Sequence, residues 1–167
     1  MEAKKTAEQP EEGAFRAAAA GPGEAERLVE AVRRFHGESG HEVGPAQAAA
    51  IRALCSDVSL GRAWLLADGR QDVGYALAYW RHSIDHGGRV AVLDDLWIDA
   101  AFRGHGLGRR LLGAVLAEVS GVGARAVVVE ADPTDAPAMA LYRRLGFAPK
   151  GTTILVRTLN AAWIGGR

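Results

Sequence analysis

The sequence predicts an α+β domain built on a mixed, mostly antiparallel central sheet. Two helix-like segments come first, several neighbouring strand-like segments follow, and strands then alternate with helices. A glycine-rich loop at residues 103–109 separates a strand-like run from an amphipathic helix-like run. The 167 residues, 49% of them apolar, suffice for one domain with a sizeable core.

Apolar spacing and turn residues locate the expected elements. Strands are predicted at residues 15–18, 63–67, 73–81, 90–98, 126–129 and 152–159, with a hairpin around the turn Asp68-Gly69-Arg70. Helices are predicted at residues 24–35, from Pro45 onward, at 107–120 and at 136–145, with Gly146 as the last C-cap. Residues 1–12 are charged and interrupted by proline, which predicts a mobile tail. The single domain is then expected at residues 13–167.

Composition argues against several classes of protein. Lysine plus arginine and aspartate plus glutamate are both 20, so no excess of positive charge favours nucleic acid as a partner. No apolar run approaches the roughly 20 residues that cross a bilayer, and the first residues show no secretory signal. The single Cys55 excludes an internal disulfide framework. We expect a cytoplasmic protein without a membrane partner.

The loop Arg103-Gly104-His105-Gly106-Leu107-Gly108-Arg109 predicts an anion site. Three glycines at alternate positions place bare backbone N–H groups at the start of a helix, where the peptide dipoles favour negative charge. The absence of Cβ atoms lets a phosphate approach the main chain closely. We therefore expect a cofactor that carries phosphate.

A dinucleotide fold is one candidate for this loop. It requires a G-x-G-x-x-G motif and an acidic residue about 20 residues further on, and Glu130 follows Gly104 by 26 residues. However, Arg109 occupies the position of the third glycine, and only 58 residues remain beyond it. The phosphate-loop NTPase motif is absent, because no Gly-Lys-Ser/Thr follows the glycines.

The second candidate is a family resemblance, carried by four pieces in order. Arg103-x-x-Gly106-x-Gly108 resembles the R/Q-x-x-G-x-G/A pyrophosphate loop of the GNAT superfamily, the acetyl-CoA-dependent N-acetyltransferases. The other pieces are the preceding strand Leu93-Asp94-Asp95-Leu96-Trp97-Ile98, the strand end Val129-Glu130-Ala131 and the segment Ala138-Met139-Ala140-Leu141-Tyr142-Arg143-Arg144-Leu145-Gly146-Phe147. The last resembles the family's A-x-x-L-Y-x-x-x-G-F segment. The resemblance spans about residues 61–159 and implies a GNAT fold of six to seven strands and about four helices.

The resemblance also implies how acetyl-CoA is held. The N–H groups of the glycine loop would bind the pyrophosphate, with added charge from Arg103 and Arg109. Free backbone groups of the preceding strand would pair with pantetheine. The expected cofactor-binding residues are Leu96, Trp97, Ile98, Arg103, Gly104, His105, Gly106, Leu107, Gly108, Arg109 and Asp135. Asp135 stands where the family commonly has an asparagine that touches the pantetheine arm, and it is also expected to N-cap the helix that carries Tyr142.

The implied reaction is direct transfer of acetyl to a primary amine of a small molecule in a ternary complex. Tyr142 falls on the tyrosine that protonates the departing thiolate in many relatives. Glu130 matches a glutamate of bacterial ribosomal-protein N-terminal acetyltransferases, and Asp94 matches a substrate-contacting acid of spermidine/spermine-type relatives. Either carboxylate, or an ordered water, could remove the amine's proton. Strand alternation is expected to place Asp94 and Asp95 on opposite faces.

Several points are left open by the sequence. Trp80, His82 and Asp85 are expected to border the acceptor cleft. His82, His86 and His105 cluster in sequence, but no third ligand is evident, so no metal is expected. The alternative functions are a non-catalytic acyl-CoA-binding module and an acetyltransferase of protein N-terminal amines. Monomer and homodimer both remain open.

Overall fold

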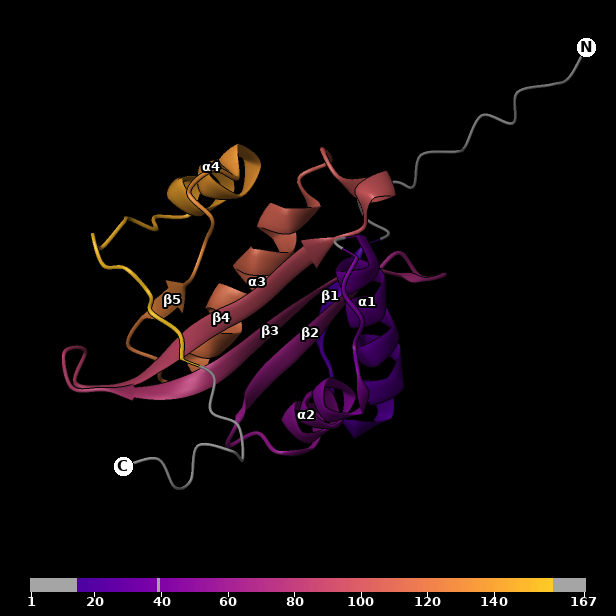
Figure 1. Cartoon of the computed structure of the whole chain (residues 1–167), viewed down its shortest axis with the longest axis horizontal. Helices are drawn as coiled ribbons and strands as arrows, with labels where there is room; N and C mark the ends of the chain where they lie inside the picture. The colour runs from indigo at the N-terminus through magenta and orange to yellow at the C-terminus, as the bar shows by residue number, and fades with distance from the viewer. Residues whose placement is uncertain (1–14, 39, 158–167) are drawn as a thin grey trace, which may run out of the picture.

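The computed structural model describes residues 15–38 and 40–157 (Figure 1). Its described strands are β1 (Arg16–Ala19), β2 (Gly61–Ala67), β3 (Asp72–Ser83), β4 (Gly88–Ile98) and β5 (Val127–Val129). Its helices are α1 (Ala25–Glu38), α2 (Pro45–Ser56), α3 (Leu107–Gly121) and α4 (Ala136–Arg144), with short 3₁₀ turns η1 (Pro22–Glu24) and η2 (Ala100–Phe102). The strands form one sheet in the order β1-β2-β3-β4-β5, antiparallel except for the parallel pair β4–β5.

Helices cover the two faces of the sheet separately. On one face, Leu28 and Val32 of α1 and Ile51 of α2 pack with Tyr75 and Trp97 from the strands. On the other face, α3 buries its apolar stripe against side chains of β2, β3 and β4; the buried members are Trp64, Leu66, Ala76, Leu93, Leu107, Leu111, Leu112, Val115 and Val119. Each fully buried large apolar side chain contributes roughly 1.5–3 kcal/mol to folding. The sheet is therefore a rigid platform between two cores.

Glycine allows β3 and β4 to approach closely where β4 ends. A Cβ atom at Gly74 would lie 2.7 Å from the Trp97 carbonyl oxygen and 2.6 Å from Ile98 Cδ1. No side chain fits there without shifting the backbone of β4. Glycine at position 74 thus allows the last residues of β4 to lie close against β3.

The predicted α+β class and the predicted helices are confirmed, and α1 runs three residues beyond its expected end. The described residues contain five strands, fewer than the six to seven expected. The difference lies at the predicted strand 152–159: residues 152–157 form no strand, and 158 and 159 fall outside the described residues. Leu155 and Val156 are 91% and 85% exposed there, because no neighbouring strand covers them. The predicted tail at residues 1–12 also lies outside the described residues.

Candidate active site between β4 and β5

Two features of β4 define the site: its pairing with β5 ends partway along the strand, and a β-bulge lies at the same position. The parallel pairing of β4 with β5 ends where Leu93 lies opposite Val129, while β4 continues to Ile98 paired only with β3. At this point the β3–β4 register skips Asp94, since Ala78 pairs with Leu93 and Leu77 with Asp95. The extra residue bends β4 away from its straight course. A gap between β4 and β5 follows.

Backbone groups of β4 face this gap. The Asp99 N–H donates to the Val73 carbonyl at 2.9 Å, which fixes the phase of the ladder with β3. Because hydrogen-bonded pairs alternate in an antiparallel ladder, Trp97 bonds toward β3, whereas Leu96 and Ile98 direct their N–H and C=O groups away from it. The Trp97 side chain is 3% exposed and packs beneath α1. Leu96 and Ile98 thus present the polar main chain that a linear amide could pair with.

The glycine loop follows β4 and begins α3. Gly104 and Gly106 have φ angles of +84° and +75°, in the left-handed region that favours glycine. The first helical hydrogen bond runs from the Arg110 N–H to the Gly106 carbonyl at 3.1 Å, so the preceding N–H groups lie outside the helical ladder. Leu107 is buried and fixes the helix start against the core. The loop is a ready anion site at a helix N-terminus.

Gly108 brings the second helix of the site close. A Cβ atom at Gly108 would lie 3.3 Å from Leu141 Cδ2, so glycine here allows α4 to pack near the start of α3. Leu141 immediately precedes Tyr142 in α4. The loop glycines therefore shape both the anion site and the placement of Tyr142.

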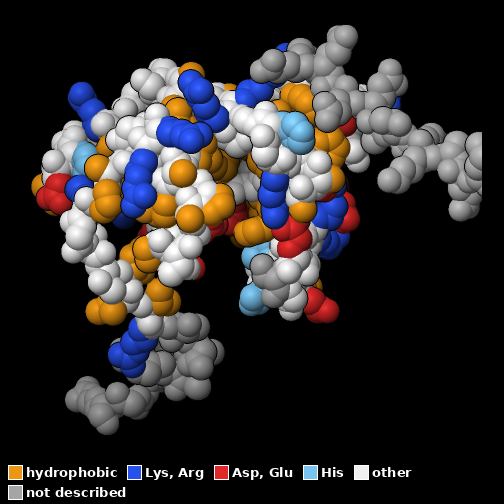
Figure 2. Space-filling view, turned by 90° about the horizontal axis from the view of Figure 1, so that it is seen from above, with side chains coloured by type: hydrophobic (Ala, Val, Ile, Leu, Met, Phe, Trp, Pro, Cys, Tyr) orange, Lys and Arg blue, Asp and Glu red, His pale blue; other side chains and the backbone are white. Residues whose placement is uncertain are grey.

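The basic side chains of this region divide into two groups. Arg103 is turned back from the loop: its Nε donates to the Ile98 carbonyl at 2.8 Å and its guanidinium pairs with Glu38 at 2.6 Å. His105 and Arg109 are exposed on the loop and the first turn of α3, and Arg143 and Arg144 are exposed at the end of α4. Figure 2 shows lysine and arginine side chains gathered around the upper rim of a recess on this side of the molecule.

Tyr142 and Glu130 line the same large hollow. Both residues line an open space of about 1190 Å³ between β5, α4 and the segment that follows α4. The Tyr142 ring is half-buried and packs at 5.6 Å from the Phe147 ring. Burial raises the pKa of the Tyr142 phenol, and the charges of Asp135 and Asp95 raise it further. Tyr142 therefore keeps its proton at neutral pH.

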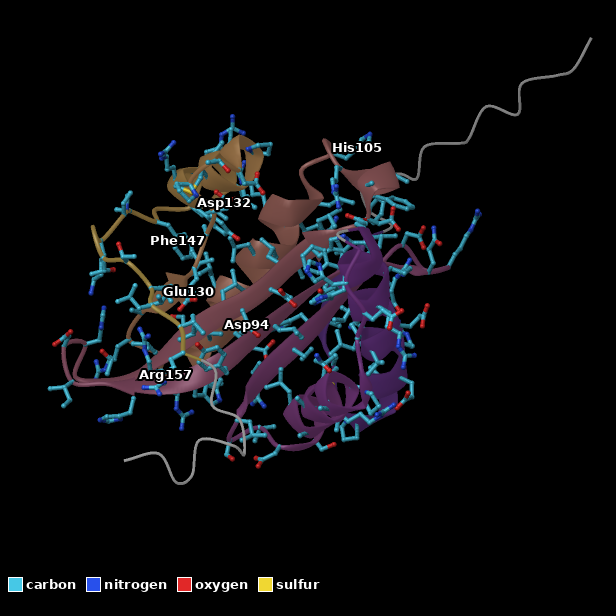
Figure 3. The ribbon with its side chains drawn as sticks, viewed as in Figure 1. Asp94, His105, Glu130, Asp132, Phe147 and Arg157 are labelled. Carbon is cyan, nitrogen blue, oxygen red and sulfur yellow. The ribbon has the colours of Figure 1, made fainter. Side chains whose placement is uncertain are left out.

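A group of carboxylates lies at the bulge. Asp95 is half-buried and accepts a hydrogen bond from the Tyr75 hydroxyl at 3.2 Å. Burial raises the pKa of Asp95, and the neighbouring charge of Asp94 adds to this. The pKa of Tyr79 is raised by burial and then by Asp94 and Glu130. Figure 3 labels Asp94 on β4 and Glu130 just after the end of β5.

The bulge bears on the expectation that Asp94 and Asp95 lie on opposite faces. Tyr75 lies on the α1 face, and the charges of both Asp95 and Asp94 raise its pKa. The bulge breaks the two-residue alternation on which the expectation depended. Alternation along β4 therefore does not by itself assign Asp94 to the face opposite Asp95.

Other sequence predictions have simpler surroundings. The Asp135 carboxylate accepts from the Ala138 N–H at 3.0 Å, which confirms it as the N-cap of α4. The Trp80 indole donates to the Val58 carbonyl, and His86 Nδ1 lies 2.9 Å from the Ser83 hydroxyl. Within residues 15–38 and 40–157, no group of three metal-ligating side chains occurs. In that same part of the chain, no helix has the length and apolar character needed to cross a membrane.

Sequence reasoning missed three residues of this site. Glu38 at the end of α1 contacts both Trp97 and Arg103. The Tyr75 hydroxyl donates to Asp95, and the charges of Asp94 and Glu130 raise the pKa of Tyr79. The one signal in the sequence was the adjacent pair Asp94-Asp95 inside an apolar strand, which is unusual for a regular strand and typical of a bulge.

Solved structures with the same fold include proteins from several sources. An integron cassette protein, HFX_CASS3, from the mobile metagenome of Cole Harbour Salt Marsh, is 31% identical over 86% of this chain and 90% of that chain, with a TM-score of 0.77. The aminoglycoside acetyltransferase meta-AAC0020, from an uncultured soil metagenomic sample and in complex with trehalose, is 17% identical over 89% and 99%, with a TM-score of 0.78. AAC(6')-Iy, in complex with the bisubstrate analogue CoA-S-monomethyl-acetylneamine, is 18% identical over 87% and 99%, with a TM-score of 0.74.

A search of curated protein sequences finds no match. The family model described as Acetyltransferase (GNAT) family matches residues 25–147, which include α1, the whole sheet after β1, the glycine loop and α4. This match covers most of the chain and agrees with the fold of the similar structures. The chain belongs to the GNAT family of acetyltransferases.

Proposed function

We propose that this protein transfers acetyl from acetyl-CoA to a primary amine of a small, cationic molecule. The observation that carries the proposal is the set of groups found where β4 and β5 part: an anion-binding helix start, strand backbone unpaired on one side, a protonated tyrosine, and carboxylates without an ion pair among the described residues. Each part answers one need of the reaction. A pure acyl-CoA-binding module has no need of the tyrosine and the carboxylates together.

The loop and the strand support acetyl-CoA as the donor. Its pyrophosphate fits the N–H groups between Gly104 and Arg109, where the helix dipole favours an anion. Its pantetheine amides fit the polar backbone of Leu96 and the N–H of Ile98, since these groups face away from β3. The exposed Arg109 and His105 lie where they can add positive potential.

The acidic group supports a cationic acceptor. Asp94 and Glu130 are exposed, and no ion pair of either is found among the described residues. Asp95 has only the Tyr75 hydroxyl as its hydrogen-bond partner in the same residues. Figure 2 shows acidic side chains at the bottom of the central recess. Carboxylates that line a recess without an ion-pair partner attract ammonium ions.

The chemistry then assigns a role to each group. The ammonium ion loses one proton to the Glu130 carboxylate, and the freed nitrogen lone pair attacks the thioester carbonyl carbon. The tetrahedral intermediate collapses with cleavage of the C–S bond, and the thiolate accepts the Tyr142 phenol proton. The second proton of the attacking nitrogen passes through water to the Tyr142 phenolate, and Glu130 releases its proton to solvent, so both groups return to their starting state. Asp94 binds and orients the cationic acceptor. The products are an N-acetyl amide and free CoA.

A panel of amines with acetyl-CoA, followed by thiol release, tests the proposal. We expect thiol release that depends on a primary amine carrying a second positive charge, with an N-acetylated product detected by mass spectrometry. The Gly106→Asp variant is the control for uncatalysed aminolysis, because it disrupts the anion site. Binding of acetyl-CoA without release of thiol for any amine or peptide N-terminus would favour a non-catalytic module.

A further inference from the structure

We propose that Glu38 is a positioning residue for acetyl-CoA, which acts by holding Arg103 and Trp97 so that the loop and the end of β4 keep the geometry that binds pyrophosphate and pantetheine. This inference rests on the proposed function. It assigns the Arg103 guanidinium to the protein's own backbone and not to the phosphate.

Glu38 contacts both segments that would hold the cofactor. Its carboxylate accepts from the Trp97 indole at 3.2 Å and from the Arg103 guanidinium at 2.6 Å. Arg103 in turn donates its Nε to the Ile98 carbonyl at 2.8 Å. One carboxylate thus connects the C-terminal end of α1, the end of β4 that β5 does not reach, and the first residue of the glycine loop.

A second residue of α1 holds the same junction from the other side. Arg34 lies four residues before Glu38 and therefore on the same helix face. Its guanidinium lies 5.4 Å from the centre of the Trp97 ring and 3.5 Å from Asp99, and it donates to the Asp72 carbonyl at 2.7 Å. The chain from Trp97 to Arg103 is thereby fixed to α1 at both ends.

The position of Glu38 is unfavourable for the helix alone. An acidic residue in the last turn of a helix meets the negative end of the peptide dipole. The contacts with Arg103 and Trp97 offset this repulsion. The contacts with Arg103 and Trp97 thus explain why a negative charge is stable at position 38.

The ion pair also bears on what Arg103 does. Its guanidinium is already satisfied by a carboxylate and a carbonyl, so releasing it to a phosphate would leave the Ile98 carbonyl and Glu38 without their charged partner. Phosphate binding is then left to the loop N–H groups. Two accounts of Arg103 therefore predict opposite effects of changing Glu38.

The test is the Michaelis constant for acetyl-CoA in the Glu38→Gln variant. If Glu38 positions the loop, this Michaelis constant rises roughly three- to tenfold, because the variant loses one partly exposed charged hydrogen bond. The maximal rate and the constant for the amine stay nearly unchanged. With acetyl-pantetheine, which lacks the pyrophosphate, the effect on the donor constant is smaller. An unchanged or lowered constant for acetyl-CoA overturns the proposal, since it would mean that a released Arg103 binds phosphate.

Two further variants sharpen the result. Glu26→Gln is the matched control, because Glu26 also lies on α1 and forms a two-pronged pair with Arg52 at 2.6 and 3.0 Å, away from the loop. Glu26→Gln should leave the Michaelis constant for acetyl-CoA unchanged. Any decrease in its melting temperature should be similar to that of Glu38→Gln. Arg103→Lys keeps the charge but loses the planar fork, so it should weaken acetyl-CoA as Glu38→Gln does. Wild-type affinity in Arg103→Lys contradicts the proposal, whereas failure of the unmodified protein to bind acetyl-CoA contradicts the proposed function instead.

Discussion

At the scale of single residues, the surroundings of Tyr142 and of the carboxylates separate an acid from a base. Burial raises the pKa of Tyr142, so its phenol holds its proton at neutral pH and has one to donate to the departing thiolate. Glu130 is exposed and lines the same hollow. The phenol can therefore donate a proton, and the carboxylate in the same hollow is the group proposed to accept one.

Removing the Tyr142 hydroxyl tests the acid. Tyr142→Phe retains the ring that packs on Phe147, so the melting temperature should hold. Turnover should fall on the order of 10²-fold, which is typical of a lost general acid. Steady-state rates and a thermal melt measure the two effects. An unchanged rate would remove Tyr142 from the mechanism.

The pH profiles of two variants separate the candidate bases. Glu130→Gln should depress turnover wherever the amine is mainly charged, and the defect should shrink at high pH, where free amine needs no base. Asp94→Asn should instead raise the Michaelis constant for the amine, with less effect on the maximal rate. Rates from about pH 6 to 9 are the measurement. A Glu130→Gln profile identical in shape and height to the wild type would assign the base elsewhere.

Asp95 predicts a stability change with pH. Its pKa in the folded protein lies above the ordinary value of 3.8, because burial and Asp94 disfavour the charged form. The folded state then holds this proton more tightly than the unfolded state, so stability falls as pH rises through that window. Asp95→Asn should melt at a higher temperature than the wild type at pH 7, and the difference should shrink as the pH falls toward 4. A difference that grows at low pH would show that the carboxylate is stabilised by its contacts.

At the scale of elements, the glycine loop allows a matched comparison. Gly106 and Gly123 have φ angles of +75° and +82°, and a Cβ atom at either would meet open space. Replacement by aspartate therefore has a similar backbone cost at both positions, about 1–2 kcal/mol. Only Gly106→Asp places a negative charge in the anion site. Gly106→Asp should abolish stabilisation by acetyl-CoA in a thermal melt, and Gly123→Asp should retain it. Equal behaviour of the two variants would argue against a phosphate in this loop.

The sequence predicted this loop and most elements because they depend on local signals. Glycine at alternate positions predicts a loop, and apolar residues at helical spacing predict a helix, from only a few neighbouring residues. The bulge at Asp94 could not be predicted in the same way, since it depends on how Leu77 and Ala78 of β3 align with β4. The contacts of Glu38 were missed for a similar reason: they join residues 59 and 65 positions apart. Long-range register and long-range ion pairs are properties of the folded chain.

At the scale of the whole molecule, two cores on opposite faces of one sheet leave a gap where β4 and β5 part. Asp95 and Glu38 lie on the α1 and α2 side, through their contacts with Tyr75 and Trp97. The α3 and α4 side carries the glycine loop and Tyr142, with Glu130 in the same hollow as Tyr142. A donor bound at the loop and an acceptor bound at the acidic group would then meet within the gap. This meeting requires that acetyl-CoA binds at the glycine loop and the end of β4.

The most direct test is therefore a comparison of acetyl-CoA with NADH as stabilising ligands. Both carry a pyrophosphate and an adenosine, so a general phosphate site would not distinguish them. A ligand that binds only the native state stabilises it by about 2.7 kcal/mol at 100 times its dissociation constant, which a thermal melt resolves easily. We predict that acetyl-CoA raises the melting temperature in a concentration-dependent way and that NADH does not. Stabilisation by NADH without stabilisation by acetyl-CoA would contradict the account.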